Sequence, residues 1–178
     1  MIYQKTTDMV QIKKCTFEHM TKSYPCKEKS VLDGCMIMRQ SIKPEDVQSP
    51  FQVEAYALLF CISGEVNIIS DLRSYTVTPG RLFVYLPNNI IKIDCKKESI
   101  ISEVILASDY LRKNFLQWNK ISPLFIQTTN NPVITIPTNR RDELIRMLDN
   151  IQERIKTATC SEWNRKAYHA ALKTFLYD

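Results

Sequence analysis

Residues 55–89 read AYALLFCISGEVNIISDLRSYTVTPGRLFVYLPNN, and this stretch decides the fold. Short blocks of β-branched and aromatic residues alternate with turn-forming Gly, Pro, Asn and Asp. Gly64 suits a turn that needs a positive φ, and Pro79-Gly80 suits the two central positions of a type II turn. The pattern is typical of antiparallel strands joined by tight turns, with Asp71-Leu72-Arg73 closing a hairpin.

The same rhythm continues on both sides of this stretch. Because the predicted strands are short and closely spaced, we expect a sandwich or barrel rather than alternating β-α units. Residues 1 to about 30 are polar and irregular, with weak strand character near Met9 to Ile12, and we expect them to form an N-terminal arm or an outer strand. The predicted strands are Cys35–Gln40, Glu54–Ile62, Val66–Ser70, Ser74–Thr78, Leu82–Leu86, Ile90–Cys95, Ile100–Ala107 and Asn131–Pro137.

After Pro137 the hydrophobic period changes from two to about 3.6, which predicts a helix over residues 139–157. Ser161 is expected to cap a second helix, and Ser108 a shorter one before it. The apolar stripe of the first helix can pack onto the barrel or pair with a second copy of the chain. We assign it to dimerisation, because it offers more apolar edge than one sheet face needs: Leu144, Ile145, Leu148, Ile151 and Ile155.

The composition favours one domain. A chain of 178 residues with 44% hydrophobic content can bury one good core. We therefore expect a barrel with its arm over residues 1–137 and a helical segment of the same domain over residues 138–178. The net charge is +5, but the 24 basic and 19 acidic residues are interspersed, so the segment itself is not expected to bind nucleic acid. Neither a secretion signal nor a membrane span is recognisable, which predicts a cytoplasmic protein without membrane contact.

The cysteines and histidines show no metal-binding spacing. No Cys-x-x-Cys pair occurs and the chain has two histidines, so buried, reduced thiols are the expected state of its six cysteines. We interpret both tryptophans, Trp118 and Trp163, as packing anchors. The cysteines are Cys15, Cys26, Cys35, Cys61, Cys95 and Cys160.

The order of these motifs resembles the amino-terminal sensor domain of AraC-type transcription regulators. The resemblance covers roughly residues 51–115 and depends on Tyr56, Ser63-Gly64-Glu65, Pro79-Gly80, Pro87 and Ser108-Asp109-Tyr110-Leu111. It implies a double-stranded β-helix, the jelly roll of the cupin fold, followed by helices. It also implies a homodimer that binds a small-molecule effector and reads DNA only through a C-terminal helix-turn-helix domain, which this sequence does not supply.

The wider cupin family holds a catalytic metal through His and Glu side chains at fixed positions. On this sequence those positions fall at Phe51, Val53, Ala57 and about Ile91 or Lys92, and none of these residues is a usual ligand of divalent metals. We therefore expect no metal, no cofactor and no catalytic residue. Protein purified without chelator is expected to contain no stoichiometric iron, manganese or zinc.

Strand alternation places Ala57, Leu59, Cys61 and Ser63 on one face of their strand. By the resemblance this face points into the barrel and lines the effector pocket, together with Phe51 and Val53. A turn at residues 96–99 would set Lys92 opposite Glu103. This pair is either an effector contact or a solvent-facing ion pair.

The resulting hypothesis is a non-catalytic, ligand-sensing and dimerising domain of an AraC-type regulator. Two alternatives remain: a stand-alone cupin-fold enzyme, and a small-molecule or carbohydrate-binding protein. The sequence identifies neither the effector nor the target genes.

Overall fold

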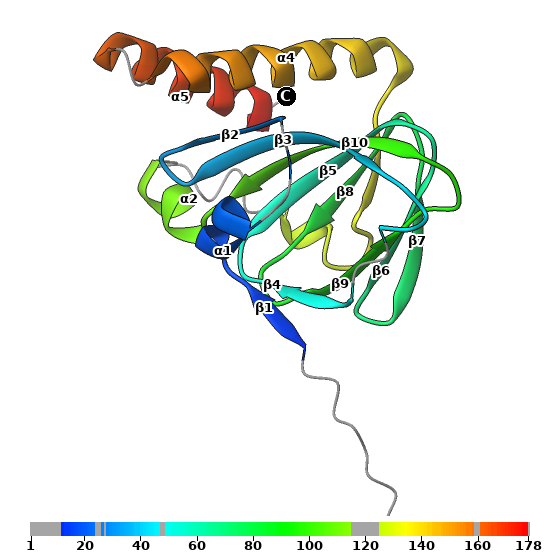
Figure 1. Ribbon diagram of the computed structural model, residues 1–178. Helices are drawn as coiled ribbons and strands as arrows, with labels where there is room; N and C mark the ends of the chain where they lie inside the picture. The colour runs from blue at the N-terminus through cyan, green and yellow to red at the C-terminus, as the bar shows by residue number, and fades with distance from the viewer. Residues whose placement is uncertain are drawn as a thin grey trace, which may run out of the picture.

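The computed structural model describes residues 12–23, 26, 28–46, 49–114, 125–158 and 161–177 (Figure 1). Strands predominate up to residue 135, and two long helices follow. The strands are β1 (Lys13–Cys15), β2 (Glu28–Leu32), β3 (Cys35–Ile42), β4 (Phe51–Val53), β5 (Tyr56–Ser63), β6 (Val66–Ser70), β7 (Arg73–Val77), β8 (Arg81–Tyr85), β9 (Ile90–Asp94), β10 (Ser99–Leu106) and β11 (Val133–Thr135). The helices are α1 (Phe17–Ser23), α2 (Ser108–Asn114), α4 (Thr138–Ala158) and α5 (Glu162–Tyr177).

The strands form two sheets, between which the chain crosses repeatedly. Sheet A has the order β1-β4-β9-β6-β7, and sheet B the order β11-β8-β5-β10-β3-β2. From β3 to β10 the chain changes sheet at every step except the β6–β7 hairpin. This path is the double-stranded β-helix, or jelly roll, of the cupin fold, so the predicted fold class is confirmed: mainly β with two C-terminal helices.

The turns form as their residues predict. Gly64 and Gly80 have φ of +84° and +89°, and the amide of Arg81 donates to the carbonyl of Thr78 at 2.9 Å. The β6–β7 hairpin turns through Asp71 and Leu72, both at positive φ. A leucine is unusual in that conformation.

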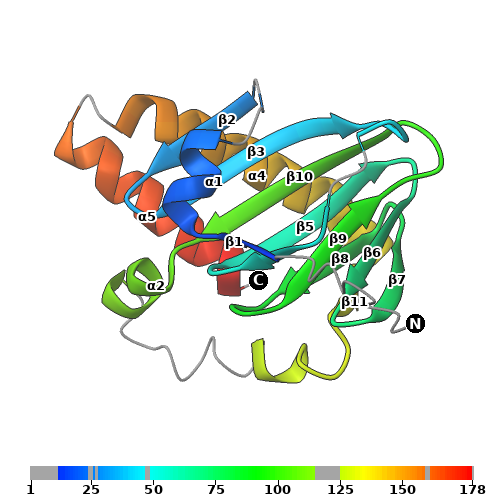
Figure 2. The same ribbon diagram turned by 60° about the horizontal axis from the view of Figure 1, so that its bottom comes forward.

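Sheet B separates two hydrophobic cores. In Figures 1 and 2, α4 and α5 cover the face of sheet B that is turned away from sheet A. Alternate side chains of β5 therefore serve different cores: Ala57 and Leu59 belong to the inter-sheet core, whereas Leu58 and Phe60 belong to the helix-side core. The inter-sheet core includes Met36, Met38, Val53, Cys61, Ile68, Phe83, Ile91 and Ile101; the helix-side core includes Ile37, Val84, Val104, Leu148, Ile151, Ile155, Tyr168 and Phe175.

Of the two predictions for the N-terminal residues, the outer strand is confirmed and the irregular arm is wrong for the residues that the structure describes, because β1 and β2 are edge strands of sheets A and B. β1 pairs in parallel with β4, and β2 forms a hairpin with β3. Figure 1 shows α1 at one end of the gap between the sheets, and its Met20 is only 3% exposed in the inter-sheet core. The hydrophobic pattern did not reveal these elements because at most two side chains of each are buried.

The predicted pairing of Lys92 with Glu103 is also wrong. After Cys95 the chain crosses from sheet A to sheet B instead of folding back as a hairpin. Lys92 therefore lies opposite Ile69, and Glu103 lies between Met38 and Leu59. The turn at residues 96–99 connects the two sheets, which alternation along one strand cannot reveal.

The two long helices match their predicted ranges, and Ser161 caps α5 by accepting the amide of Asn164 at 3.1 Å. The assignment of the apolar stripe of α4 to a dimer contact needs correction. Leu148, Ile151 and Ile155 are 1–4% exposed and pack into the chain's own helix-side core. Leu144 packs against the same core, and Ile145 is half-buried. The stripe thus covers sheet B, which is packing onto the barrel, the second possibility that the sequence left open.

Two further expectations can be compared with the structure. Trp163 is 78% exposed with the Lys166 ammonium 5.1 Å from its ring centre, so it is not a packing anchor; Trp118 lies outside the described residues. Cys35, Cys61 and Cys95 are free and buried, as predicted, whereas Cys15 and Cys26 are free and only half-buried. Cys160 lies outside the described residues. None of the described helices combines the length and apolarity needed to cross a bilayer.

Candidate functional site

The structure brings most of the predicted effector residues together in the inter-sheet core. Half-buried Phe51 packs beside fully buried side chains there, whereas Ser63 is exposed at the end of β5 and Lys92 is half-buried on the outer face of sheet A. The core members are Phe51, Val53, Ala57, Leu59, Cys61 and Glu103. An effector can reach these side chains only by displacing an element that covers them, because the buried members are at most 3% exposed.

Glu103 is the one acidic side chain buried among the described residues. It alternates with Ile101 and Ile105 on β10, whose side chains belong to the inter-sheet core. Burial raises the pKa of its carboxyl group to about 7, and a hydrogen bond with Tyr85 acts in the opposite direction. Its Oε2 atom has no hydrogen-bond partner among the described residues.

Within the described ranges, no group of three or more His, Cys, Asp or Glu side chains is arranged to hold a metal ion. The cupin metal positions are occupied as the sequence indicates. Val53, Ala57 and Ile91 are buried apolar residues, and Phe51 packs against them.

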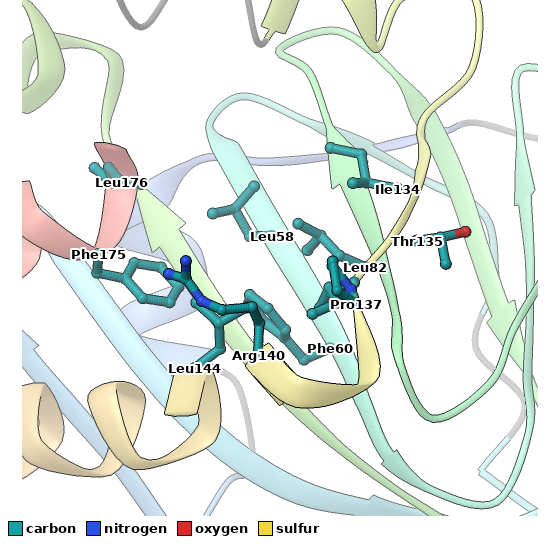
Figure 3. A pocket seen from close by; sticks show the side chains of 11 residues that line it. Leu58, Phe60, Leu82, Ile134, Thr135, Pro137, Arg140, Leu144, Phe175 and Leu176 are labelled. Atoms are coloured by element: carbon teal, nitrogen blue, oxygen red, sulfur yellow. The ribbon is translucent and has the colours of Figure 1, made fainter. Parts of the chain in front are cut away.

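A cavity of about 270 Å³ lies on the other side of sheet B, between the sheet and the C-terminal helices (Figure 3). Strands β5, β8 and β11, the loop that leads into α4, the first turns of α4 and the end of α5 all contribute to its wall. The floor is buried, and the rim includes half-buried and exposed residues. The lining residues are Leu58, Phe60, Leu82, Ile134, Thr135, Ile136, Pro137, Arg140, Leu144, Phe175 and Leu176.

The start of α4 places a basic side chain, Arg140, at the rim of this cavity. The first turn of α4 contains no acidic residue, although the partial positive charge of a helix N-terminus favours one. It carries Arg140 and Arg141 instead. Arg140 Nε lies 2.8 Å from Glu143 Oε2 in a partly exposed ion pair, and Arg141 donates to the carbonyl of Ile62 at 2.9 Å. Figure 3 shows Arg140 among the apolar lining side chains.

Two features of the sequence could have indicated this cavity. Tyr56, Leu58, Phe60 and Ile62 are apolar on the face opposite the predicted pocket, which indicated that the strand is covered on both sides. The pair of arginines at the start of a helix was the second signal. Neither shows that the covering helices leave a space, because a cavity depends on how elements pack.

A polar network anchors α5 beside the cavity-forming elements. The Tyr110 hydroxyl of α2 lies 2.8 Å from Nδ1 of His169, whose Nε2 is 3.4 Å from Oδ2 of Asp33 in the β2–β3 turn. Arg165 also contacts Asp33, at 3.1 Å. Burial lowers the pKa of His169, and the Asp33 carboxylate opposes this shift.

No protein-family model matches the sequence, and no curated protein is significantly similar to it. Among solved structures, the EutQ protein of Clostridium difficile is similar with a TM-score of 0.36 and 17% identity over 42% of this chain and 58% of that chain. A cupin superfamily protein of Desulfitobacterium hafniense is similar with a TM-score of 0.42 and 18% identity over 44% of this chain and 72% of that chain. A cupin-2 domain protein of Shewanella frigidimarina is similar with a TM-score of 0.39 and 12% identity over 42% of this chain and 72% of that chain. These similarities cover less than half of this chain, and the fold assignment depends on the strand order.

Proposed function

We propose that this chain is a non-catalytic sensor of a small-molecule effector and the dimerising part of an AraC-type transcription regulator. The observation that carries the proposal is the cavity between sheet B and the two C-terminal helices. A molecule in this cavity contacts the barrel and both helices at once. Its affinity therefore depends on their arrangement, which is the requirement for a ligand to shift a conformational equilibrium.

The resemblance of the turn motifs to AraC-type sensor domains supports the regulatory part of the proposal. In such a regulator, DNA recognition belongs to a helix-turn-helix domain that follows the helical segment. Helices α4 and α5 would then transmit the state of the cavity to that domain.

The dimer contact that we propose differs from the buried stripe. A groove between α4 and α5 on their outer side is lined in part by Met147 and Ala171, with Glu143 and Arg146 at its edge. Both apolar residues are half-buried, so a second copy can cover them without disrupting the core of either chain.

The test joins the chain to a DNA-binding domain that represses its operator only as a dimer. We expect repression of a reporter, together with a dimer mass by light scattering for the isolated chain. Ala171→Arg is expected to abolish both, whereas Glu162→Arg, an exposed position at the start of α5, leaves both unchanged. A chain that stays monomeric and a fusion that does not repress would refute the proposal.

A further inference from the structure

We propose that the cavity under the C-terminal helices binds a small amphipathic carboxylate, with its apolar body in the cavity and its acid group at the start of α4. This inference rests on the sensing role proposed above and names the chemical class of the effector.

The apolar body is specified by the wall of the cavity. Leu58, Phe60 and Leu82 form part of the wall and are 3–9% exposed, and Phe175 closes the wall from α5 at 5%. Ligand sites in proteins are mostly apolar clefts with a few polar groups that fix orientation. The cavity volume of about 270 Å³ is slightly below the roughly 300–1,000 Å³ of typical ligand pockets, so the ligand is small.

The acid group is specified by the charge at the rim. Arg140 is the one charged residue among the described lining residues, and it lies in the first turn of a 21-residue helix. The helix dipole and the guanidinium both favour an anion there. The neighbouring Arg141 adds positive charge and is held in place by the carbonyl of Ile62.

The ion pair of Arg140 with Glu143 does not block this role. The two side chains are 39% and 47% exposed, and ion pairs of this kind contribute little to stability. A guanidinium has five N–H donors and can bind more than one acceptor at the same time. The ligand acid group thus supplies the negative charge that the first turn of α4 lacks.

Calorimetric titration with decanoate, below its micelle concentration, tests the proposal on the whole chain. We expect one decanoate per chain. 1-Decanol has the same tail without the charge and should bind about tenfold more weakly, the size of one charge-assisted hydrogen bond. Decyltrimethylammonium, with the opposite charge, should bind more weakly still. Equal affinity for all three would overturn the assignment of an acid.

Variants test the position of the ligand. Arg140→Gln should weaken decanoate binding about tenfold and leave decanol binding unchanged. Lys156→Gln, at an exposed position near the other end of the same helix, is the control and should change neither. If both variants affect decanoate equally, the rim assignment is wrong.

Filling the cavity tests the apolar part. Ile134→Trp and Leu144→Trp enlarge half-buried lining residues, and at least one of them should keep the wild-type circular dichroism. Either folded variant should lose binding of both decanoate and decanol. Undiminished binding would mean that decanoate binds elsewhere, and the proposal would fail.

The experiments give different results when this inference fails and when the proposed function fails. If decanoate does not bind while the fusion still represses its reporter, the ligand class alone is refuted. If the fusion does not repress, the proposed function is refuted whatever decanoate does.

Discussion

At Glu103, a carboxyl group lies in a core formed otherwise by aliphatic, aromatic and sulfur-containing side chains. The pKa of this group is raised from 4.5 to about 7 because burial disfavours its charged form. The unfolded chain ionises near pH 4.5 and the folded chain does not. The contribution of Glu103 to folding stability is therefore fully present below pH 4.5 and is lost as the pH rises from there through 7.

Replacing Glu103 by Gln should remove this loss. At pH 8, Glu103→Gln is expected to be more stable than the wild type by about 3 kcal/mol, and at pH 4 the two should be nearly equal. Urea unfolding between pH 4 and pH 8 measures the difference. Glu65→Gln, at an exposed position, is the control and should follow the wild-type curve. A parallel pH dependence for Glu103→Gln and the wild type would contradict the buried carboxyl.

His169 is the second titrating residue that the fold shifts. In the tautomer that carries its proton on Nε2, the imidazole donates a hydrogen bond to the Asp33 carboxylate, and Nδ1 accepts one from the Tyr110 hydroxyl. The pKa of the imidazole is lowered below 6.5, so the contribution of His169 to stability is present above pH 6.5 and is lost as the pH falls.

The Tyr110→Phe variant tests this network. Removing the hydroxyl donor removes a hydrogen bond to the neutral imidazole, and the pKa of His169 should rise. Because the chain has two histidines, imidazole proton resonances can be followed individually by NMR, with His19→Gln for assignment. A His169 pKa above 6.5 in the wild type, or no change in the variant, would be incompatible with the network.

At the scale of single elements, the β2–β3 hairpin depends on one glycine. Gly34 has φ of +86°, and a Cβ atom there would lie 2.7 Å from Cβ of Tyr110. Gly34→Ala therefore combines backbone strain with a steric clash against α2. Gly80 has a similar φ of +89°, but a Cβ there would meet nothing closer than 4.0 Å.

The two glycines thus form a matched pair of variants. Gly80→Ala should cost about 1 kcal/mol for its backbone conformation alone. Gly34→Ala should cost at least about 2 kcal/mol, because Tyr110 has to move as well. Chemical denaturation compares them. Equal losses would show that the contact with Tyr110 does not constrain the hairpin.

Local signals predicted the elements well and their assembly less well. Val66–Ser70 was predicted with its observed bounds, and α4 to within one residue at each end, because hydrophobic period and capping residues act within a few positions. α1 and β2 were missed, since few of their side chains are buried. The Lys92–Glu103 pair failed because the residues between them cross from one sheet to the other.

The candidate site shows the same limit. Alternation correctly placed Ala57, Leu59 and Cys61 on one face and their neighbours on the other, and the resemblance to cupin domains correctly turned the first face toward the barrel interior. It could not show that the interior is tightly filled at these residues while a cavity remains beneath the helices. That distinction depends on the distance between layers, which no single strand or helix encodes.

For the whole molecule, the helices act as a layer of the fold. Leu148→Ala removes a side chain that is 1% exposed in the helix-side core and should cost about 2–5 kcal/mol. Ile145→Ala, one helical turn earlier and half-buried, should cost less than half as much. Urea denaturation at several protein concentrations measures both. A loss for Leu148→Ala that disappears as concentration increases would assign this residue to a dimer contact instead.

The central position of β10 determines when the barrel can form during synthesis. In sheet B, β10 lies between β3 and β5, and Ser99 pairs with Ile42 across 57 positions of the sequence. A nascent chain that has not yet reached residue 106 cannot join these strands, so its earlier strands leave the ribosome with open hydrogen-bonding edges. Such non-local pairing slows folding to roughly the millisecond-to-second range. It also makes this protein dependent on protection from aggregation until β10, the ninth strand after α1, has been made.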